Sequence, residues 1–292
     1  MVNEDAIRGY HPISLSDALD FLDSYDATVF AGGTDLMVKH RRFSGLTPSL
    51  NKPVLFISHL KAMHGIQVND GILTIRAATT LTDLLSAPQV PTFIKAVLRE
   101  LASVSIRNLG TIGGNICNAS PAGDTIPMLV ALDAELELTS LMDKRTLPIC
   151  DFILGPGKTA LGHGELLTAI HIPILPTFEP ENAYNHFFYR KIGNRKSNAI
   201  SKISFFGIAH KDPLKFNEIR MAFGAAAPTV IRDKTCEKQI IGLEHDIIES
   251  RIDIFLQQIE SKLNPIDDIR STKDYRLDVL LNLTRSFILD EH

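Results

Sequence analysis

The sequence predicts an α+β fold in two domains. Apolar residues recur at helical spacing in some segments and alternate at strand spacing in others, and in the second half strand-like runs are followed by helical stretches. The 292 residues suffice for two domains, at roughly 100–200 residues per domain. With 45% hydrophobic and 22% charged residues, the composition excludes disordered, collagen-like and coiled-coil chains.

The first third of the chain is expected to begin with a helix and continue as strands. Leu15, Ala18, Leu19 and Leu22 share one helical face, and Ser14 precedes them as an N-cap. The β-rich runs that follow are expected as strands at 28–31, 54–58, 66–68 and 72–77, the last two forming a hairpin around Asn69-Asp70-Gly71.

Helical and alternating patterns both occur between residues 93 and 172. The elements expected there are a helix at 93–104, a glycine-rich loop at 108–123, a helix from Ile126 to Leu132, a hairpin of 135–139 with 146–149, and a strand at 166–172.

A proline-rich, polar segment at 173–185 marks the expected domain boundary. We therefore expect a first domain at 1–176, with lobes at about 1–55 and 56–176, and a second domain at 177–292. In the second domain, strands are expected at 203–208 and 219–223, and helices at 246–262 and 272–289.

Charge and cysteine content exclude several classes of function. The net charge of −4 does not suit a nucleic-acid-binding protein, because neutralising phosphates requires a basic face. Cys117, Cys150 and Cys236 are too few for the four ligands of an iron–sulfur cluster, and we expect them to be buried. The acidic N-terminus and the lack of a long apolar run favour a cytoplasmic protein without a membrane span.

Two glycine-containing segments are the strongest candidates for a binding site. The first glycine segment, residues 31–35 (Ala-Gly-Gly-Thr-Asp), follows a strand, and its backbone amides can approach an anion closely. The alternative is a tight turn in which Asp35 caps a helix.

The second glycine segment, residues 108–123, is too long for a simple connection. Two such segments in one domain are expected to share a ligand with two phosphates, since neutral amides bind a pyrophosphate without a lysine cluster. Asp124, which follows, either accepts a hydrogen bond from a ribose hydroxyl or caps the next helix.

Other nucleotide-binding and catalytic motifs are absent from the sequence. The run 155–159 (Gly-Pro-Gly-Lys-Thr) ends like a P-loop, but Phe152 occupies the position of the first required glycine, so a plain turn is expected. The sequence contains no zinc-protease or serine-hydrolase motif, and we assign neither a metal ligand nor a catalytic acid or base.

Taken together, residues 31–36 and 106–121 with Asp124 resemble the FAD-binding subunits of molybdenum hydroxylases, a family that includes the flavin subunits of xanthine, carbon monoxide and nicotinate dehydrogenases. The resemblance continues at 187–195, 223–229 and 273–276 and so covers nearly the whole chain. It implies the family's fold, a two-lobed FAD-binding domain followed by a smaller α+β domain.

The resemblance also implies the residues that contact FAD. They are Thr28, Val29, Phe30, Ala31, Gly32, Gly33, Thr34, Asp35, Thr111, Ile112, Gly113, Gly114 and Asn115, with Asp124 toward the adenosine, and also Leu167 and Lys191. The alternative for Lys191 is a solvated lysine at a strand edge, and Arg190 beside it leaves the register open by one residue.

By resemblance, the chain is an oxidoreductase subunit that passes electrons from iron–sulfur clusters through FAD to NAD+ or another acceptor. A molybdopterin-binding large subunit and an iron–sulfur small subunit would be its partners, and xanthine or another purine the substrate of the complex. The alternatives are the flavin subunit of a nicotinate or carbon monoxide dehydrogenase-type complex, a stand-alone FAD oxidoreductase of similar fold, and a nucleotide-binding module without redox activity.

Overall fold

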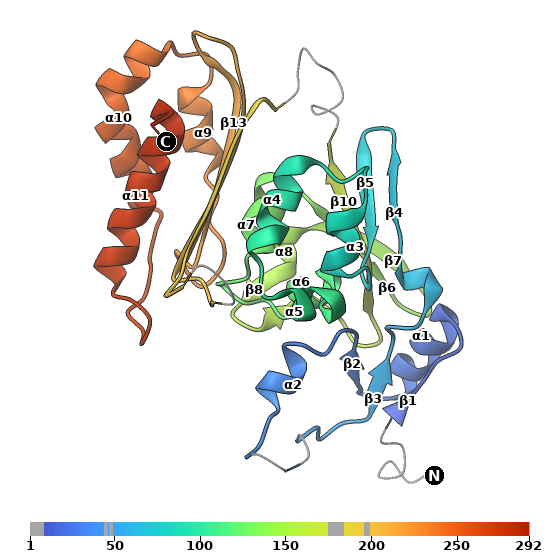
Figure 1. The fold of residues 1–292 in the computed structure, drawn as a ribbon. Coiled ribbons are helices and arrows are strands. Elements are labelled where there is room, and N and C mark those ends of the chain that lie inside the picture. Colours follow the sequence, from blue (N-terminus) through green and yellow to red (C-terminus); the bar gives the residue numbers. More distant parts are fainter. Residues whose placement is uncertain (1–8, 44–45, 47–48, 175–183, 196–198, 292) are drawn as a thin grey trace.

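The strands of the computed structural model form four sheets within the described residues, which are 9–43, 46, 49–174, 184–195 and 199–291. Helices cover two of these sheets, and Figure 1 shows the C-terminal strands and helices packed beside the first domain. The predicted α+β fold is thus confirmed. Most of the expected boundary segment, residues 175–183, lies outside the described residues.

A small parallel sheet at the N-terminal end carries the first glycine segment. Its strands β1 (Gly9–Tyr10), β3 (Val54–Phe56) and β2 (Thr28–Phe30) lie in the order β1-β3-β2. Helix α1 (Leu15–Ser24) buries the predicted Ala18, Leu19 and Leu22, and Ser14 caps it by accepting a hydrogen bond from the amide of Asp17. Strand β2 leads through the first glycine segment into the short helix α2 (Leu36–Lys39), so this segment lies between a strand and a helix, as predicted.

A five-stranded antiparallel sheet forms the rest of the first domain. Its order is β4 (Ile66–Asn69), β5 (Ile72–Arg76), β10 (Leu166–Pro173), β6 (Glu135–Thr139) and β7 (Lys144–Pro148). The predicted hairpin turns at Asp70 and Gly71, which both have positive φ. The helices drawn beside this sheet in Figure 1 are α3 (Leu81–Ser86), α4 (Thr92–Glu100), α7 (Thr125–Ala131) and α8 (Ile149–Phe152).

The helix predicted over 93–104 is confirmed only as far as Glu100, and the prediction of a loop over the whole of 108–123 was wrong. Helix α4 ends at Glu100, and Ala102 reverses the chain with φ of 52°. A new helix, α5 (Val104–Leu109), then begins after the N-cap Ser103. The guanidinium of Arg107 stabilises the turn between the two helices by donating hydrogen bonds to the carbonyl oxygens of Leu101 (2.8 Å) and Ala102 (2.9 Å). Within the predicted loop lies α6 (Ile112–Cys117), which the sequence conceals because its two glycines lower helix propensity.

The C-terminal domain consists of one antiparallel sheet with helices on its outer face. Strands β11 (His186–Ile192), β12 (Ile203–Lys211) and β13 (Phe216–Gly224) lie in this order, and β12, β13, α10 (His245–Glu260) and α11 (Lys273–Leu289) match the predicted elements. Strand β11 and helix α9 (Lys234–Ile240) were not predicted. Figure 1 shows the sheet between these helices and α7 of the first domain.

The run that resembles a P-loop is a turn, as predicted. It joins β8 (Ile153–Gly155) to β9 (Lys158–Thr159), and Gly157 supplies the positive φ. The cysteine prediction was wrong in part, because Cys236 is buried but Cys117 is half-buried and Cys150 is exposed on α8. Within the described residues, no helix is long and apolar enough to cross a bilayer.

An ion pair at the start of α11 makes part of the stability of the C-terminal domain dependent on pH. Asp268 accepts hydrogen bonds from the amides of Arg270 (2.8 Å) and Ser271 (3.1 Å) and lies 2.6 Å from the guanidinium of the buried Arg276. Burial alone would raise the pKa of Asp268, but these contacts lower it from 3.8 to about 2. A carboxyl with a lowered pKa stabilises the fold above its unfolded-state pKa and loses this effect as the pH falls.

We therefore expect the free energy of unfolding to decrease between pH 4 and about pH 2, in part through Asp268. The Asp268→Asn variant is expected to be less stable than the parent protein at pH 5 and to show a smaller decrease between these pH values. Urea denaturation at several pH values measures this difference. Parallel pH profiles for the two proteins would contradict the role given to Asp268.

Candidate functional site

The two glycine segments, far apart in the sequence, are in direct contact. A β-carbon added to Gly32 would lie only 1.9 Å from the carbonyl oxygen of Leu109 and 3.1 Å from the α-carbon of Gly110. A β-carbon added to Gly110 would in turn lie 3.4 Å from the hydroxyl oxygen of Thr34. The absence of a side chain at Gly32 is therefore what lets the first glycine segment lie against the end of α5, whereas the distance from Gly110 to Thr34 is an ordinary van der Waals contact.

Unused backbone amides make the first glycine segment an anion-binding candidate. Within the described residues, the amides of Gly32, Gly33 and Thr34 donate to no protein acceptor. Gly33 has φ of 70°, a conformation that glycine adopts without strain. The side chain of Asp35 makes no capping hydrogen bond, so the simple-turn alternative with an Asp35 cap does not describe this segment.

The second glycine segment has a different local role. The amides of Ile112 and Gly113 donate to the carbonyl oxygens of Thr79 (3.2 Å) and Ala77 (2.9 Å), that of Gly114 to the hydroxyl of Thr111 (3.1 Å), and that of Asn115 to the carbonyl of Thr111 (3.0 Å). These donors are occupied within the protein. Gly113 instead permits close packing, since an added β-carbon would lie 2.7 Å from the carbonyl oxygen of Ala77. The segment thus forms a wall against which the first segment rests.

Asp124 lies at the junction of the two domains. It is 8% exposed and accepts hydrogen bonds from the ammonium group of Lys191 (2.6 Å) on β11 and from the hydroxyl of Ser201 (2.5 Å). It does not cap α7, so the capping alternative was wrong. Burial raises the pKa of Asp124, although the contacts with Lys191 and Ser201 act in the opposite direction.

Lys191 and its neighbour Arg190 have different surroundings in the structure. The Lys191 side chain is 5% exposed, which excludes the solvated alternative, and it points toward the first domain. The guanidinium of Arg190 instead lies 4.4 Å from the centre of the Phe188 ring, which belongs to the core of the C-terminal domain. Alternation along the strand accounts for this difference.

Tyr189 and Ser201 belong to the same junction and were missed by the sequence analysis. Tyr189 is 4% exposed and packs into the core of the first domain, and its hydroxyl has no hydrogen-bond partner within the described residues. A buried hydroxyl without a partner is unusual and indicates a site for a ligand or water. Side chains alternate along β11, so Tyr189 lies on the same face of the strand as Lys191. This spacing of two residues is the one sequence signal that could have identified Tyr189 as part of the junction.

The remaining predicted contacts differ in how close they lie to the segments. Thr28, Val29 and Phe30 form β2, and Phe30 packs beneath the first segment, where a β-carbon on Gly33 would meet its ring. Leu167 is buried in β10, and its neighbour Thr168 accepts a hydrogen bond through its carbonyl oxygen from the amide of Ala77, whose own carbonyl accepts the amide of Gly113.

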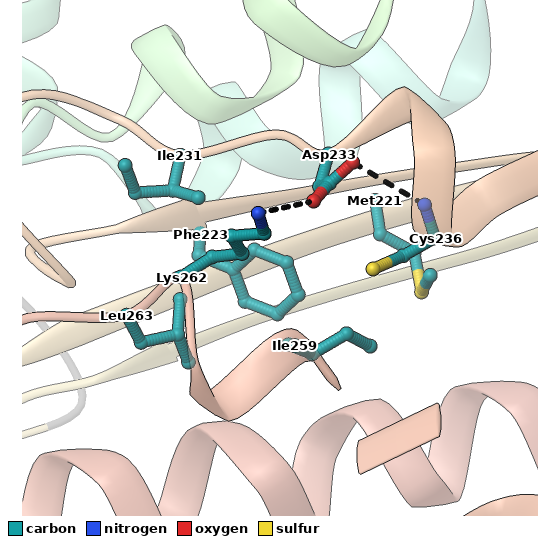
Figure 2. Close-up of a pocket in the computed structure, with 8 residues that line it drawn as sticks. All are labelled: Met221, Phe223, Ile231, Asp233, Cys236, Ile259, Lys262 and Leu263. Atoms are coloured by element: carbon teal, nitrogen blue, oxygen red, sulfur yellow. Dashed lines mark hydrogen bonds and ion pairs between the residues drawn. The ribbon is translucent and has the colours of Figure 1, made fainter. Parts of the chain in front are cut away.

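A hollow in the C-terminal domain is too small for a dinucleotide. Figure 2 shows a hollow between β13, α9 and α10, lined by apolar side chains with Asp233 and Lys262, but its volume of about 10 Å³ holds one water molecule at most. No group of three or more potential metal ligands occurs among the described residues.

Both the N-terminal and the C-terminal part of the chain match known protein families. Residues 5–175 match the family described as the FAD binding domain in molybdopterin dehydrogenase, and residues 188–290 match the carbon monoxide dehydrogenase flavoprotein C-terminal domain. The two matches together cover nearly the whole chain.

Individual relatives are similar over their full length. The chain is 33% identical to a putative xanthine dehydrogenase FAD-binding subunit of Escherichia coli K12, covering 96% of this chain and 94% of that protein. It is 30% identical to the glyceraldehyde dehydrogenase medium chain of Sulfolobus acidocaldarius, covering 93% of each. The structure superimposes on a chain of the Cu,Mo-containing carbon monoxide dehydrogenase with a TM-score of 0.85 and 25% identity, covering 97% of this chain and 96% of that one.

Proposed function

This chain belongs to the family of FAD-binding subunits of molybdopterin-containing dehydrogenases, and we propose that it holds one FAD with the pyrophosphate on the first glycine segment. The observation that carries this proposal is the contact between Gly32 and Leu109, beside amides that have no protein acceptor. Backbone amides can bind a pyrophosphate without a cluster of basic side chains, which agrees with the net charge of −4 of this chain.

The two domains, for which we propose the bounds 1–176 and 177–292, both contribute to this site. The first segment and Thr28 to Phe30 would hold the diphosphate, while the segment from Thr111 to Asn115 would support it and line the cleft. Asp124 and Lys191 would lie toward the adenosine, where the hydroxyl of Tyr189 is available as a donor. Leu167 would contribute apolar support from β10.

The bound flavin would supply the redox chemistry, because it accepts electrons singly or in pairs and therefore links one-electron carriers to a two-electron acceptor. This oxidoreductase subunit has too few cysteines for an iron–sulfur cluster. We propose that an iron–sulfur small subunit and a molybdopterin-binding large subunit complete the complex. In this proposal NAD+ accepts the electrons from the flavin, and xanthine or a related purine is the substrate that the complex oxidises. We also propose that the complex is cytoplasmic. The similarity to a xanthine dehydrogenase subunit supports the purine.

We expect the purified full-length chain to bind FAD in a one-to-one ratio, with flavin absorbance that co-elutes with the protein. After anaerobic photoreduction, NAD+ is expected to restore the oxidised spectrum of the bound flavin. Failure to retain or acquire FAD would contradict the proposed function. Reoxidation by oxygen or a quinone but not by NAD+ would contradict only the proposed acceptor.

A lone chain that oxidises a small molecule would overturn the proposed role as a subunit. Size-exclusion chromatography of the natively expressed protein, followed by activity assays on each fraction, distinguishes the two cases. We expect purine oxidation only in fractions that contain larger partner chains.

A further inference from the structure

Helix α7 (Thr125–Ala131) joins the two domains, and the C-terminal domain contacts it at both ends. All seven of its residues are buried. Its N-terminal end follows Asp124, and its C-terminal end leads to Asp133, which has φ of 52°. Aspartate tolerates this conformation better than most residues do.

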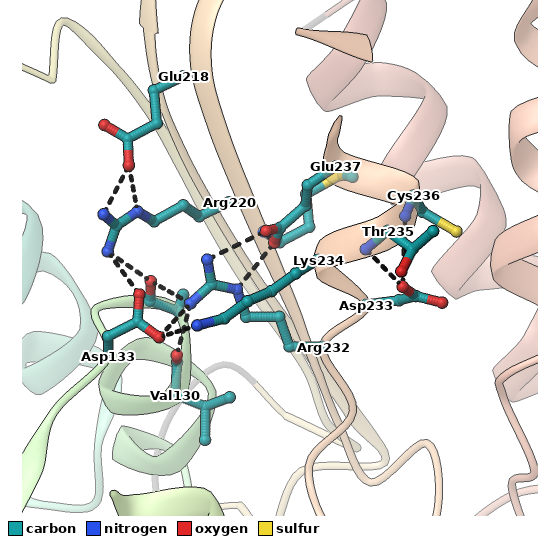
Figure 3. A network of polar contacts seen from close by, with 12 residues as sticks. Val130, Asp133, Glu218, Arg220, Arg232, Asp233, Lys234, Thr235, Cys236 and Glu237 are labelled. Atoms are coloured by element: carbon teal, nitrogen blue, oxygen red, sulfur yellow. Dashed lines mark hydrogen bonds and ion pairs between the residues drawn. The ribbon is translucent and has the colours of Figure 1, made fainter. Parts of the chain in front are cut away.

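Cations from the C-terminal domain surround the C-terminal end of α7 (Figure 3). Arg232 donates to the carbonyl oxygens of Val130 and Ala131, both at 3.0 Å, and Arg220 donates to that of Ala131 at 3.3 Å. Positive charge is favourable here because the last carbonyls of a helix carry partial negative charge. These contacts give hydrogen-bond donors to the carbonyl oxygens at the helix end, of which that of Val130 also accepts the amide of Asp133 at 3.2 Å.

Asp133 gathers the same cations around one carboxylate. It pairs with Arg220 (3.1 Å), Arg232 (3.1 Å) and Lys234 (2.6 Å). We call Asp133, Arg220, Arg232 and Lys234 the α7 clamp. Burial alone would raise the pKa of Asp133, but the hydrogen bonds and charges of these cations lower it, so the carboxylate stays ionised at neutral pH.

A buried carboxylate fixes the position of Arg232 in turn. Glu237 on α9 binds the guanidinium through two contacts, of 2.9 Å and 3.0 Å, and also accepts the amide of Met221 on β13 at 2.7 Å. A guanidinium held by two parallel contacts has little freedom to rotate. Arg232, the buried cation of the α7 clamp, is therefore held in place by the C-terminal domain.

The other end of α7 reaches the proposed cofactor site. Asp124 contacts Lys191 and Ser201, and the hydroxyl of Thr125 donates to the side-chain oxygen of Asn115 at 2.6 Å. A displacement of α7 along its axis would thus move both Asp124 and the second glycine segment, because a short buried helix moves as one body.

We infer that the α7 clamp is a positioning device for FAD, which sets the place of Asp124 and Asn115 through α7 without touching the cofactor. This inference rests on the proposed FAD site. Asp133 and Asp124 lie at opposite ends of the helix and have no partner in common among the residues that the structure describes. Any coupling between them must therefore pass through α7 or the sheet behind it.

The test compares the FAD dissociation constants of Asp133→Asn, Asp124→Asn and the double variant with that of the full-length parent protein. Asparagine keeps the backbone conformation at position 133 and removes the charge. We expect Asp133→Asn to weaken FAD binding about fivefold and to change the circular dichroism of the bound flavin. We expect the double variant to lose little more affinity than Asp124→Asn alone. Arg232→Lys is a second variant of the clamp and is expected to act in the same direction.

Arg285→Met is the matched control, because it breaks the Arg285–Asp253 ion pair in the same domain, between α11 and α10 on the side of the sheet away from α7 (Figure 1). It is expected to leave FAD affinity unchanged. Unchanged affinity in Asp133→Asn, or losses that simply multiply in the double variant, would overturn the inference. A parent protein that does not bind FAD would instead overturn the proposed function, and this inference with it.

Discussion

Gly32→Ala is expected to abolish tight FAD binding. The added β-carbon would lie 1.9 Å from the carbonyl oxygen of Leu109, so the two glycine segments must separate by about 1 Å to reach even the shortest contact found in proteins. Overpacking of this kind costs about 1–3 kcal/mol or more. Because 1.4 kcal/mol is a tenfold change in affinity, we expect FAD affinity to fall tenfold to a hundredfold. Fluorescence titration with FAD measures this loss.

Gly155→Ala is the matched control, because a β-carbon there meets no atom within 4 Å. It is expected to bind FAD like the parent protein. If Gly32→Ala does not fold, Gly110→Ala tests the contact between the segments more mildly, since its β-carbon would lie 3.4 Å from the hydroxyl oxygen of Thr34. The same β-carbon would lie 3.0 Å from the carbonyl oxygen of Ile106 in its own helix α5. Undiminished FAD affinity in either variant would show that the contact does not shape the site.

The second large effect is expected at the buried pair of Asp124 and Lys191. Removing one partner leaves the other charge buried and uncompensated, which typically costs about 3–5 kcal/mol. We therefore expect Asp124→Leu and Lys191→Met each to lower the free energy of unfolding by about this amount. Urea denaturation measures this quantity.

The double variant separates structure from function at this pair. Replacing both charges by apolar side chains of similar size is often neutral for stability. We expect Asp124→Leu with Lys191→Met to recover most of the stability but not the FAD affinity. Recovery of both would mean that the pair only joins the domains and that neither residue contacts the cofactor.

Elements with strong local patterns were predictable from the sequence. Helix α1 has both an apolar face and a serine cap, and the hairpin of β4 and β5 has an Asp-Gly turn, so local signals agree with the final structure. The two glycine segments were recognised for the same reason, because adjacent glycines after a strand are a local signal. Their contact with each other was expected only from a shared ligand.

Features that depend on distant residues could not be predicted. Helix α6 contains Gly113 and Gly114, and it forms because Ala77 and Thr79 accept its first amides. The pairing of Asp124 with Lys191 rather than with its own helix depends on the register of β11, which no local pattern fixes. The contacts of the clamp residue Arg232 likewise depend on the placement of β13 and α9 beside the end of α7, which is distant in the sequence.

The most direct test of the central claim is the response of glycine amides to FAD. Selective ¹⁵N labelling of the 18 glycines gives a tractable NMR spectrum, and Gly32→Ala and Gly110→Ala assign one resonance from each segment. We predict that the amides of Gly32 and Gly110 shift with the same FAD midpoint, while that of Gly155, assigned with Gly155→Ala, does not move. Shifts confined to one segment, or different midpoints for the two, would contradict a single diphosphate bound where the segments meet.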